Sequence, residues 1–357
     1  MTIKASGSPL SFSEISTEFG LPPGKNLGAY RVSQTYGTLT NLALDNTVNG
    51  ATITPAIPNS VAIGSSSIKF SNFYGKKLNI VLNCTQMEGI PSHLNAKSLY
   101  NNPDSIRGVS VSVIGGFKQK PTNTNGSKVY INTNTTIGSK KGAITNTAFR
   151  TGTWNGGTEL ILEMGSNTKL YGSGGDGGNS GTSDPEAGIN GTSALGIDYP
   201  TAIINRGRIQ AGWGGGGGGS YRARNVLINA GKKRSYNQWN ISSGGGGGGG
   251  AGYPAGNGGK TSGQQGNYGT AGSNGTNGGL ETQGTGGAGG AEAGAGGDGG
   301  QPRSTNATKG EDSNVAGGAA GSTGYTIIYY NNGSGSSLTN NGLIYPSDRY
   351  LYNTSPT

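Results

Sequence analysis

The residues best suited to bind a ligand lie in one basic and aromatic segment, Ser220 to Ser243. It carries five cationic and three aromatic side chains and no acidic residue. They are Tyr221, Arg222, Arg224, Lys232, Lys233, Arg234, Tyr236 and Trp239. Arginine, tyrosine and tryptophan are enriched at binding hot spots, and guanidinium groups suit phosphate and carboxylate. The segment is the main candidate binding site and predicts an anionic partner, although a solubilising loop would also be basic.

Two other segments are secondary candidates for binding. Ser183 to Pro200 is acidic and partly apolar, and Gln301 to Asn314 mixes both charges. If the basic segment does not bind, the acidic one is the next candidate.

Signals for catalysis are weak. The chain has one histidine, His93, and one cysteine, Cys84, so a Cys/His metal site and a histidine base are not supported. Gly259-Lys260-Thr261 resembles the end of a phosphate-binding loop, but Pro254 stands where the earlier glycine is needed. We expect no enzymatic activity, no cofactor and no metal. Paired carboxylates for glycan cleavage cannot be recognised from sequence and stay open.

Glycine must form the scaffold that holds these segments. Of the 73 glycines, 51 lie in the 153 residues from Gly172 to Gly324. In the later part of this stretch they recur with a period of three residues. The positions are 263, 266, 269, 272, 275, 278, 284, 287, 290, 296 and 299.

A period of three is that of the polyproline II helix, which has no internal hydrogen bonds. Its amides must pair with neighbouring segments, and a face that meets a neighbour must be glycine because a Cβ would block the approach. The uninterrupted runs Gly214–Gly219 and Gly244–Gly250 are therefore predicted in the interior of a polyglycine-II bundle. The triplets from Thr261 to Gln301 lack proline, which disfavours collagen. A flexible glycine-rich linker is the alternative.

Short β-branched runs precede the glycines. Leu78–Leu82, Val109–Ile114, Lys128–Ile131 and Glu159–Met164 read as strands. These runs predict an all-β sandwich or a small Greek-key domain. Tyr325–Tyr330 reads as a strand that returns after the glycines.

The first 77 residues contain two short apolar pieces. Ser11 precedes Glu14 at the spacing of a capping box, which predicts a helix with an apolar stripe. The second piece ends at Gly75, and a glycine in this place is typical of the end of a helix. We expect these pieces to attach the protein to a partner or to another copy; two helices sealing a small core would look the same. The predicted attachment residues are Phe12, Ile15, Phe19, Ile68, Phe70, Phe73 and Tyr74.

Composition limits the class of protein. Hydrophobic residues make up 31% of the 357 residues and charged residues 12%, with a net charge of +9. This disfavours a helical bundle, a doubly wound sheet and a single large enzyme domain. No secretory signal and no run of apolar residues long enough for a membrane span is visible. We therefore expect a protein made in a cytoplasm, without membrane insertion.

The glycine runs, entered by strand-like stretches such as Ala202–Ile209, resemble the glycine-rich adhesins at the tips of T-even-type phage tail fibres. The pieces Ser11–Gly20 and Ile68–Lys76 look like short motifs of phage tail proteins. The resemblance implies a polyglycine-II sandwich whose loops recognise outer-membrane proteins or lipopolysaccharide. The anionic partner would then be lipopolysaccharide phosphate or an acidic porin loop.

The resulting prediction is a mostly β and irregular chain of four parts. Residues 1–77 form an attachment region with short helices, 78–165 a β-rich domain, 166–324 a polyglycine-II receptor-binding domain, and 325–357 a C-terminal strand and tail. We expect a virion component assembled in the host cytoplasm that binds a host receptor and other tail proteins, but no nucleic acid. Monomer and homotrimer both fit. The alternatives are a structural baseplate or tail-fibre connector, and a depolymerase or ice-binding protein, of which ice binding is disfavoured by the basic segment.

Overall fold

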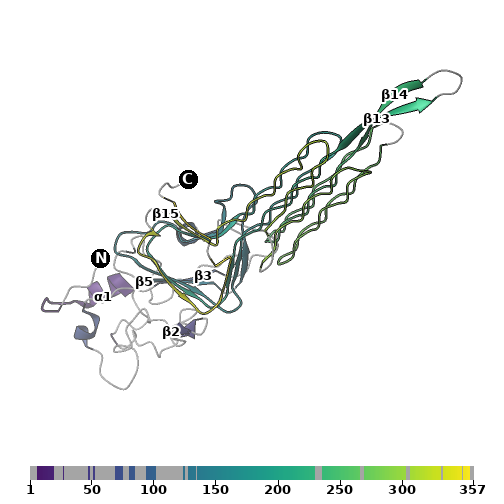
Figure 1. The fold of residues 1–357 in the computed structure, drawn as a ribbon. Coiled ribbons are helices and arrows are strands. Elements are labelled where there is room, and N and C mark those ends of the chain that lie inside the picture. The colour runs from purple at the N-terminus through teal and green to yellow at the C-terminus, as the bar shows by residue number, and fades with distance from the viewer. Residues whose placement is uncertain are drawn as a thin grey trace.

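The fold was analysed in a computed structural model, which describes most of the chain from residue 128 onward and shorter stretches before it. The described residues are 6–19, 27, 47–48, 51–52, 69–74, 80–84, 94–101, 124, 128–133, 135–229, 235–265, 269–302, 306–330, 333–347 and 349–353. Three parts follow one another in Figure 1: an N-terminal region, a strand-rich body, and a long rod that ends in a hairpin.

The N-terminal region holds short elements. They are α1 (Phe12–Phe19), β1 (Thr47–Val48), β2 (Ala51–Thr52) and the 3-10 helix η3 (Phe70–Phe73). The predicted capping box is confirmed, because the Glu14 amide donates to Ser11 Oγ (3.2 Å) and the Ser11 amide donates to Glu14 Oε2 (2.8 Å). The Tyr74 hydroxyl donates to the Ser8 carbonyl (2.7 Å), which joins the second apolar piece to the residues just before the first.

The body is built from three parallel sheets. The first contains β3 (Ile80–Cys84), β5 (Lys128–Thr133), β8 (Glu159–Met164), β11 (Thr201–Asn205) and β16 (Ser337–Asn340). The second contains β6 (Thr136–Gly138), β9 (Lys169–Tyr171), β12 (Arg208–Gln210) and β17 (Leu343–Tyr345). The third contains β4 (Leu94–Asn95), β7 (Thr147–Arg150), β10 (Ser193–Ile197), β15 (Ile327–Tyr330) and β18 (Tyr350–Asn353). The helix α4 (Ala96–Asn101) follows β4.

The chain visits the three sheets in turn, so the body is a three-sided parallel β-helix. Equivalent residues of successive coils lie above one another. For example, Leu162 pairs with Ile203, and Leu170 pairs with Ile209. These stacked side chains fill the core inside the three sheets. The predicted sandwich or Greek-key domain is wrong, because the strands pair in parallel with the next coil. Alternation along a strand shows one buried face but not the direction of the partner strand.

Most predicted strands are present in the structure. β8 has the predicted bounds, and β3, β5 and β15 lie where strands were predicted, with ends shifted by a few residues. Val109–Ile114 lies outside the described residues. The four-part division needs correction, because β9 to β12 and β15 to β18 complete the same sheets as β5 and β8. The glycine segment is instead inserted into the β-helix, between β9 and β10 and again between β12 and β15.

The inserted segments form the rod in Figure 1, which we call the glycine bundle. Amides of the Gly214–Gly219 run change partner with a period of three residues. Gly215 and Gly218 donate to one neighbouring segment, Gly216 and Gly219 to a second, and Gly217 to a third. Their acceptors are the carbonyls of Ile189 and Glu186, of Gly248 and Gly245, and of Thr308.

Three other segments donate to carbonyls of this run, so it has neighbours on all sides. The donors are Gly178 in the first segment, Gly297 and Gly300 in the second, and Gly318 and Gly321 in the third. The Gly244–Gly250 run is enclosed in the same way. None of the glycines in either run has a φ between +20° and +160°, so the mirror-image conformation open to glycine is not used there. The interior position predicted for both runs is confirmed, and the three-residue exchange of partners is what packed polyglycine-II helices require.

Asparagine and aspartate side chains complete the hydrogen bonding at the rim of the bundle. Their Oδ1 atoms accept backbone amides of the adjacent run at 2.6–2.8 Å. The pairs are Asp176 with Asn257, Asn179 with Lys260, Asn190 with Ser322, Asn274 with Thr261, Asn277 with Gly258, and Asp298 with Gly286. The rim therefore needs side chains that can act as backbone acceptors, whereas the interior admits none.

A polar contact fixes the proximal end of the bundle to the second sheet. Arg208 forms an ion pair with Glu281, and the Tyr171 hydroxyl donates to Glu281 Oε1 (3.1 Å). Burial raises the pKa of Tyr171 to about 12. Desolvation opposes ionisation of Glu281, but its hydrogen bond and charge pairing with Arg208 hold its pKa below the usual value. The turn at Glu281 is thus held to the β-helix by a charged contact.

The packing predicts that Gly217→Val is far more damaging than Asn274→Val. A Cβ at Gly217 would lie 1.8 Å from the Gly318 carbonyl oxygen, and backbone cannot move aside without breaking neighbouring hydrogen bonds. Asn274 is exposed and would lose one hydrogen bond, to the Thr261 amide, worth about 1 kcal/mol. Thermal unfolding should show a small decrease in Tm for Asn274→Val and no cooperatively folded bundle for Gly217→Val. Equal melting temperatures would contradict the packing.

Candidate functional site

The distal end of the glycine bundle is a β-hairpin. β13 (Arg222–Asn229) pairs antiparallel with β14 (Ser235–Ser242), and the pair projects beyond the rod (Figure 1). The segment predicted as a binding loop is therefore largely two strands joined at 230–234. The signal for this was present, since Gly231 separates two runs of strand-forming residues.

Three neighbouring turns hold the base of the hairpin. Ile241 and Gln265 exchange two backbone hydrogen bonds, at 2.7 and 3.0 Å. The Asn314 side chain donates to the Ala223 carbonyl (3.3 Å). Glu292 contacts Arg222 and Arg224, at 3.4 and 3.5 Å between nitrogen and oxygen atoms. The base of the hairpin is thus fixed by the bundle before any ligand binds.

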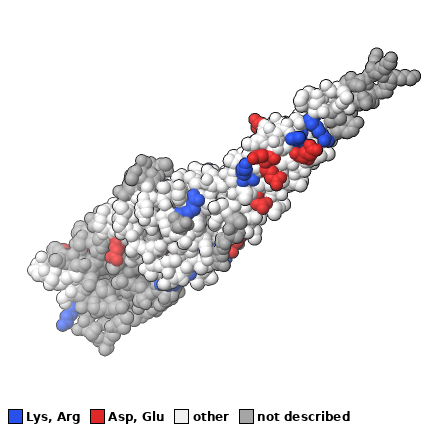
Figure 2. Space-filling view, viewed as in Figure 1, with Lys and Arg blue, Asp and Glu red and all other residues white. Residues whose placement is uncertain are grey.

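Glu292 corrects one sequence-based expectation. The basic segment was expected to lack a counter-anion, but two of its five cations are paired with this carboxylate from another turn. The contact could not be found from the segment itself, because Glu292 lies in a distant triplet and has a positive φ of 58°. Figure 2 shows the same mixing of acidic and basic side chains along the distal half of the bundle. The described base of the hairpin is therefore not an unbalanced cationic surface.

The strand register divides the hairpin into two faces. Successive residues of a strand point to opposite sides, and directly paired residues share a side. Arg222 and Arg224 pair with Ser242 and Asn240 on one side. Leu227 pairs with Asn237, and Asn225 pairs with Trp239, on the other side. The two arginines and the tryptophan that the sequence grouped together thus lie on opposite faces.

The second face carries exposed apolar side chains. Trp239 is 65% exposed and Leu227 is 61% exposed. Leu227 was not among the predicted site residues, because only the hairpin register places it beside Trp239. Exposed large apolar side chains grouped at a tip are typical of a binding surface. We call Asn225, Leu227, Asn237 and Trp239 the tryptophan face.

The remaining predicted binding residues are only partly placed. Tyr221 is half-buried just before β13. Tyr236 occupies the β14 position opposite Ile228. Lys232, Lys233 and Arg234 lie outside the described residues.

The predicted attachment residues lie near the other end of the molecule. Ile15 and Phe73 are fully buried, Phe12 and Tyr74 are half-buried, and Phe70 is 39% exposed. Ile68 and the Phe19 side chain lie outside the described residues. The structure therefore buries Ile15 and Phe73 and leaves Phe70 exposed.

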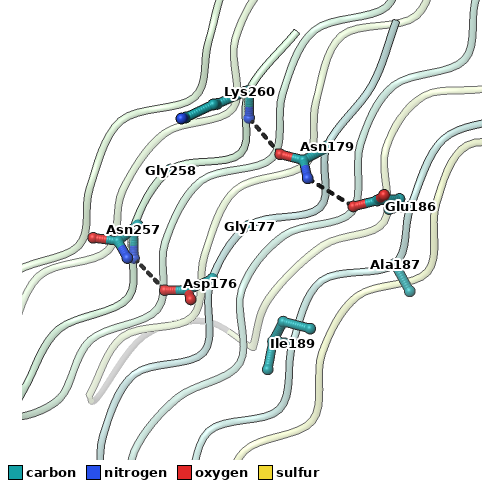
Figure 3. A pocket seen from close by; sticks show the side chains of 9 residues that line it. All are labelled: Asp176, Gly177, Asn179, Glu186, Ala187, Ile189, Asn257, Gly258 and Lys260. Carbon is teal, nitrogen blue, oxygen red and sulfur yellow. Dashed lines mark hydrogen bonds between the residues drawn. The ribbon is translucent and has the colours of Figure 1, made fainter. Parts of the chain in front are cut away.

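A second candidate is a depression of about 350 Å³ on the flank of the bundle (Figure 3). Its polar side chains already serve the bundle: Asp176 accepts the Asn257 amide (2.6 Å) and pairs with Lys141 (2.5 Å), and Asn179 donates to Glu186 (2.8 Å). The acidic segment that starts at Ser183 was expected to be a loop. Its residues Glu186 and Ile189 instead belong to an extended run that lines the depression, and β10 follows this run in the same segment. The polar side chains of this depression are therefore explained by the hydrogen bonds at the rim of the bundle.

The described residues contain no cluster of three or more His, Cys, Asp or Glu side chains arranged to hold a metal. Neither α1 nor α4, with 8 and 6 residues, could cross a membrane, and no other described helix is long and apolar enough.

Comparison with known proteins gives one family. Residues 111–348, more than half of the chain, match the family described as phage tail fibre adhesin Gp38. A crystal structure of the gp37-gp38 adhesin tip complex of the bacteriophage S16 long tail fibre is 16% identical, with a TM-score of 0.31, and the match covers 98% of this chain and 99% of that one. No curated protein matches the chain.

The contacts at the base predict a modest effect of Glu292→Gln. Both ion pairs are partly exposed, with 43% exposure for each arginine side chain and 58% for Glu292, so solvent screens them. We expect a change in unfolding free energy below about 1 kcal/mol. Faster amide hydrogen exchange should be confined to β13 and β14, since two of the contacts that hold the base remain. Global destabilisation would show that Glu292 has a larger role.

Proposed function

Because the chain belongs to the Gp38 family of phage tail fibre adhesins, we propose that its hairpin contacts a receptor on the surface of a Gram-negative host. Family membership makes the protein a component of the phage virion tail. The observation that carries the proposal is the position of the tryptophan face. It lies at the far end of a rigid rod, where Leu227 and Trp239 are exposed, and the body is at the other end.

The rod supports this role because it holds the hairpin in one orientation. Binding that does not need to order a flexible segment avoids an entropic cost. The fixed base contributes to this, since Gln265, Glu292 and Asn314 already contact the hairpin. The receptor is an outer-membrane protein loop or the lipopolysaccharide, and the proposed role is recognition without catalysis.

The N-terminal region is the proposed attachment to other tail proteins. Figure 1 places α1 at the opposite end of the molecule from the hairpin, so both ends can act at once. Ile15 and Phe73 are buried, and the hydrogen bond of Tyr74 to Ser8 joins two parts of this region that are distant in sequence. Assembly onto the fibre would take place in the host cytoplasm.

Shortening the hairpin tests the proposed receptor contact. Replacing residues 225–239 by Asn-Gly would join Arg224 to its partner Asn240 through a two-residue turn and keep the contacts of Glu292 and Gln265. We expect the purified variant to keep its melting temperature and lose binding to intact host cells. Undiminished cell binding would instead favour a structural connector or another turn as the contact.

Removing residues 1–77 tests the division of roles. The first strand of the β-helix starts at Ile80, so the shortened chain keeps every described strand of the body. We expect it to fold and bind host cells, but not to be incorporated into virions. Circular dichroism, cell binding and complementation of a phage that lacks the gene would measure the three properties. A folded fragment that fails to bind cells would contradict the division.

A further inference from the structure

The tryptophan face has a chemistry of its own. Asn225 lies directly opposite Trp239, and Asn237 precedes Trp239 by two residues, so both amides share its face. Asn225 and Asn237 are exposed, and within the described part of the chain neither carboxamide makes a hydrogen bond. A flat indole is therefore bordered by free groups that can each donate and accept hydrogen bonds.

The described residues of this face carry no charge. Arg222 and Arg224 occupy the opposite face and are paired with Glu292. Among the described residues of the hairpin, no guanidinium thus faces a ligand bound at the tryptophan face. The complementary ligand is uncharged, with one apolar flat side and hydroxyl groups at its edge.

A pyranose ring has this form, because its axial C–H groups make an apolar face and its hydroxyls lie around the ring. We propose that the tryptophan face binds an uncharged sugar ring of a bacterial surface polysaccharide, stacked on Trp239 and hydrogen-bonded by Asn225 and Asn237. Leu227 extends the apolar area beside the indole. The inference rests on the proposed function and specifies what the hairpin binds.

The chain contains a spectroscopic reporter for this site. Of its tryptophans, Trp154 and Trp213 are 5% and 7% exposed, whereas Trp239 is 65% exposed. Quenching of fluorescence by acrylamide therefore reports mainly on Trp239. A ring stacked on the indole should shift the emission to the blue and protect it from the quencher.

The probe is the polysaccharide released by mild acid from lipopolysaccharide of a strain that the full chain binds, with its phosphates removed. We expect saturable protection of Trp239, with an affinity that changes little with salt. Trp239→Ala should weaken binding by about tenfold or more, and Trp239→Phe should weaken it less; isothermal titration calorimetry measures both, because these variants lack the fluorescent reporter. Asn225→Ala and Asn237→Ala should each weaken it. Tyr352→Ala is the matched control, because it removes another exposed aromatic ring (74%) on β18, outside the hairpin.

Three results would overturn the proposal. Binding of the native but not the dephosphorylated polysaccharide, with Arg224→Gln as damaging as Trp239→Ala, would show recognition of phosphate. Cell binding that needs Trp239 without any response to the polysaccharide would show a protein receptor. If the chain with the shortened hairpin still bound cells, the proposed function of the hairpin would fail as well, which the first two results would not imply.

Discussion

The structure depends on pairing every buried amide of the glycine bundle with a neighbouring run. The runs make no internal hydrogen bonds, so their stability comes from lateral contacts, and these need backbones close enough to exclude a Cβ. Gly217 illustrates the constraint, since a Cβ there would overlap the Gly318 carbonyl oxygen. At the rim, backbone amides are paired in another way, because the side chain of Asn179 or Asn274 provides the hydrogen-bond acceptor. Composition inside and outside the bundle follows from this one rule.

The β-helix provides the fixed base that the bundle requires. Both insertions leave the second sheet and return to the third, so they start and end at the same corner of successive coils. The contacts of Arg208 and Tyr171 with Glu281 hold a proximal turn against the second sheet. At the distal end the neighbouring turns hold the hairpin through Gln265, Glu292 and Asn314. The tip is therefore positioned by side-chain and backbone contacts at both ends of the rod.

Local signals predicted local structure well, and long-range pairing was the part that sequence did not reveal. The capping box of Ser11 and Glu14, the strand at Glu159–Met164 and the interior position of Gly214–Gly219 each depend on short spacings. The β-helix was missed because alternation within a strand does not show which strand it pairs with, and because the bundle separates Ile203 from Leu338, its neighbour on the next coil. Binding by the segment Ser220 to Ser243 stays a prediction, and the structure shows that this segment is largely a hairpin. Its two faces and the pairing with Glu292 depend on strand register and on contacts between distant turns.

Insertion into the β-helix also has a mechanical consequence. A virion held at the tip would pull along the axis of the rod, while the hydrogen bonds between runs point across it. Such a load acts on the bonds in shear, so neighbouring runs must slide past one another and break many bonds together. Because the chain enters and leaves the rod at the β-helix on both insertions, the pull is divided among several parallel segments. The glycine bundle is thus suited to carry tension along its axis.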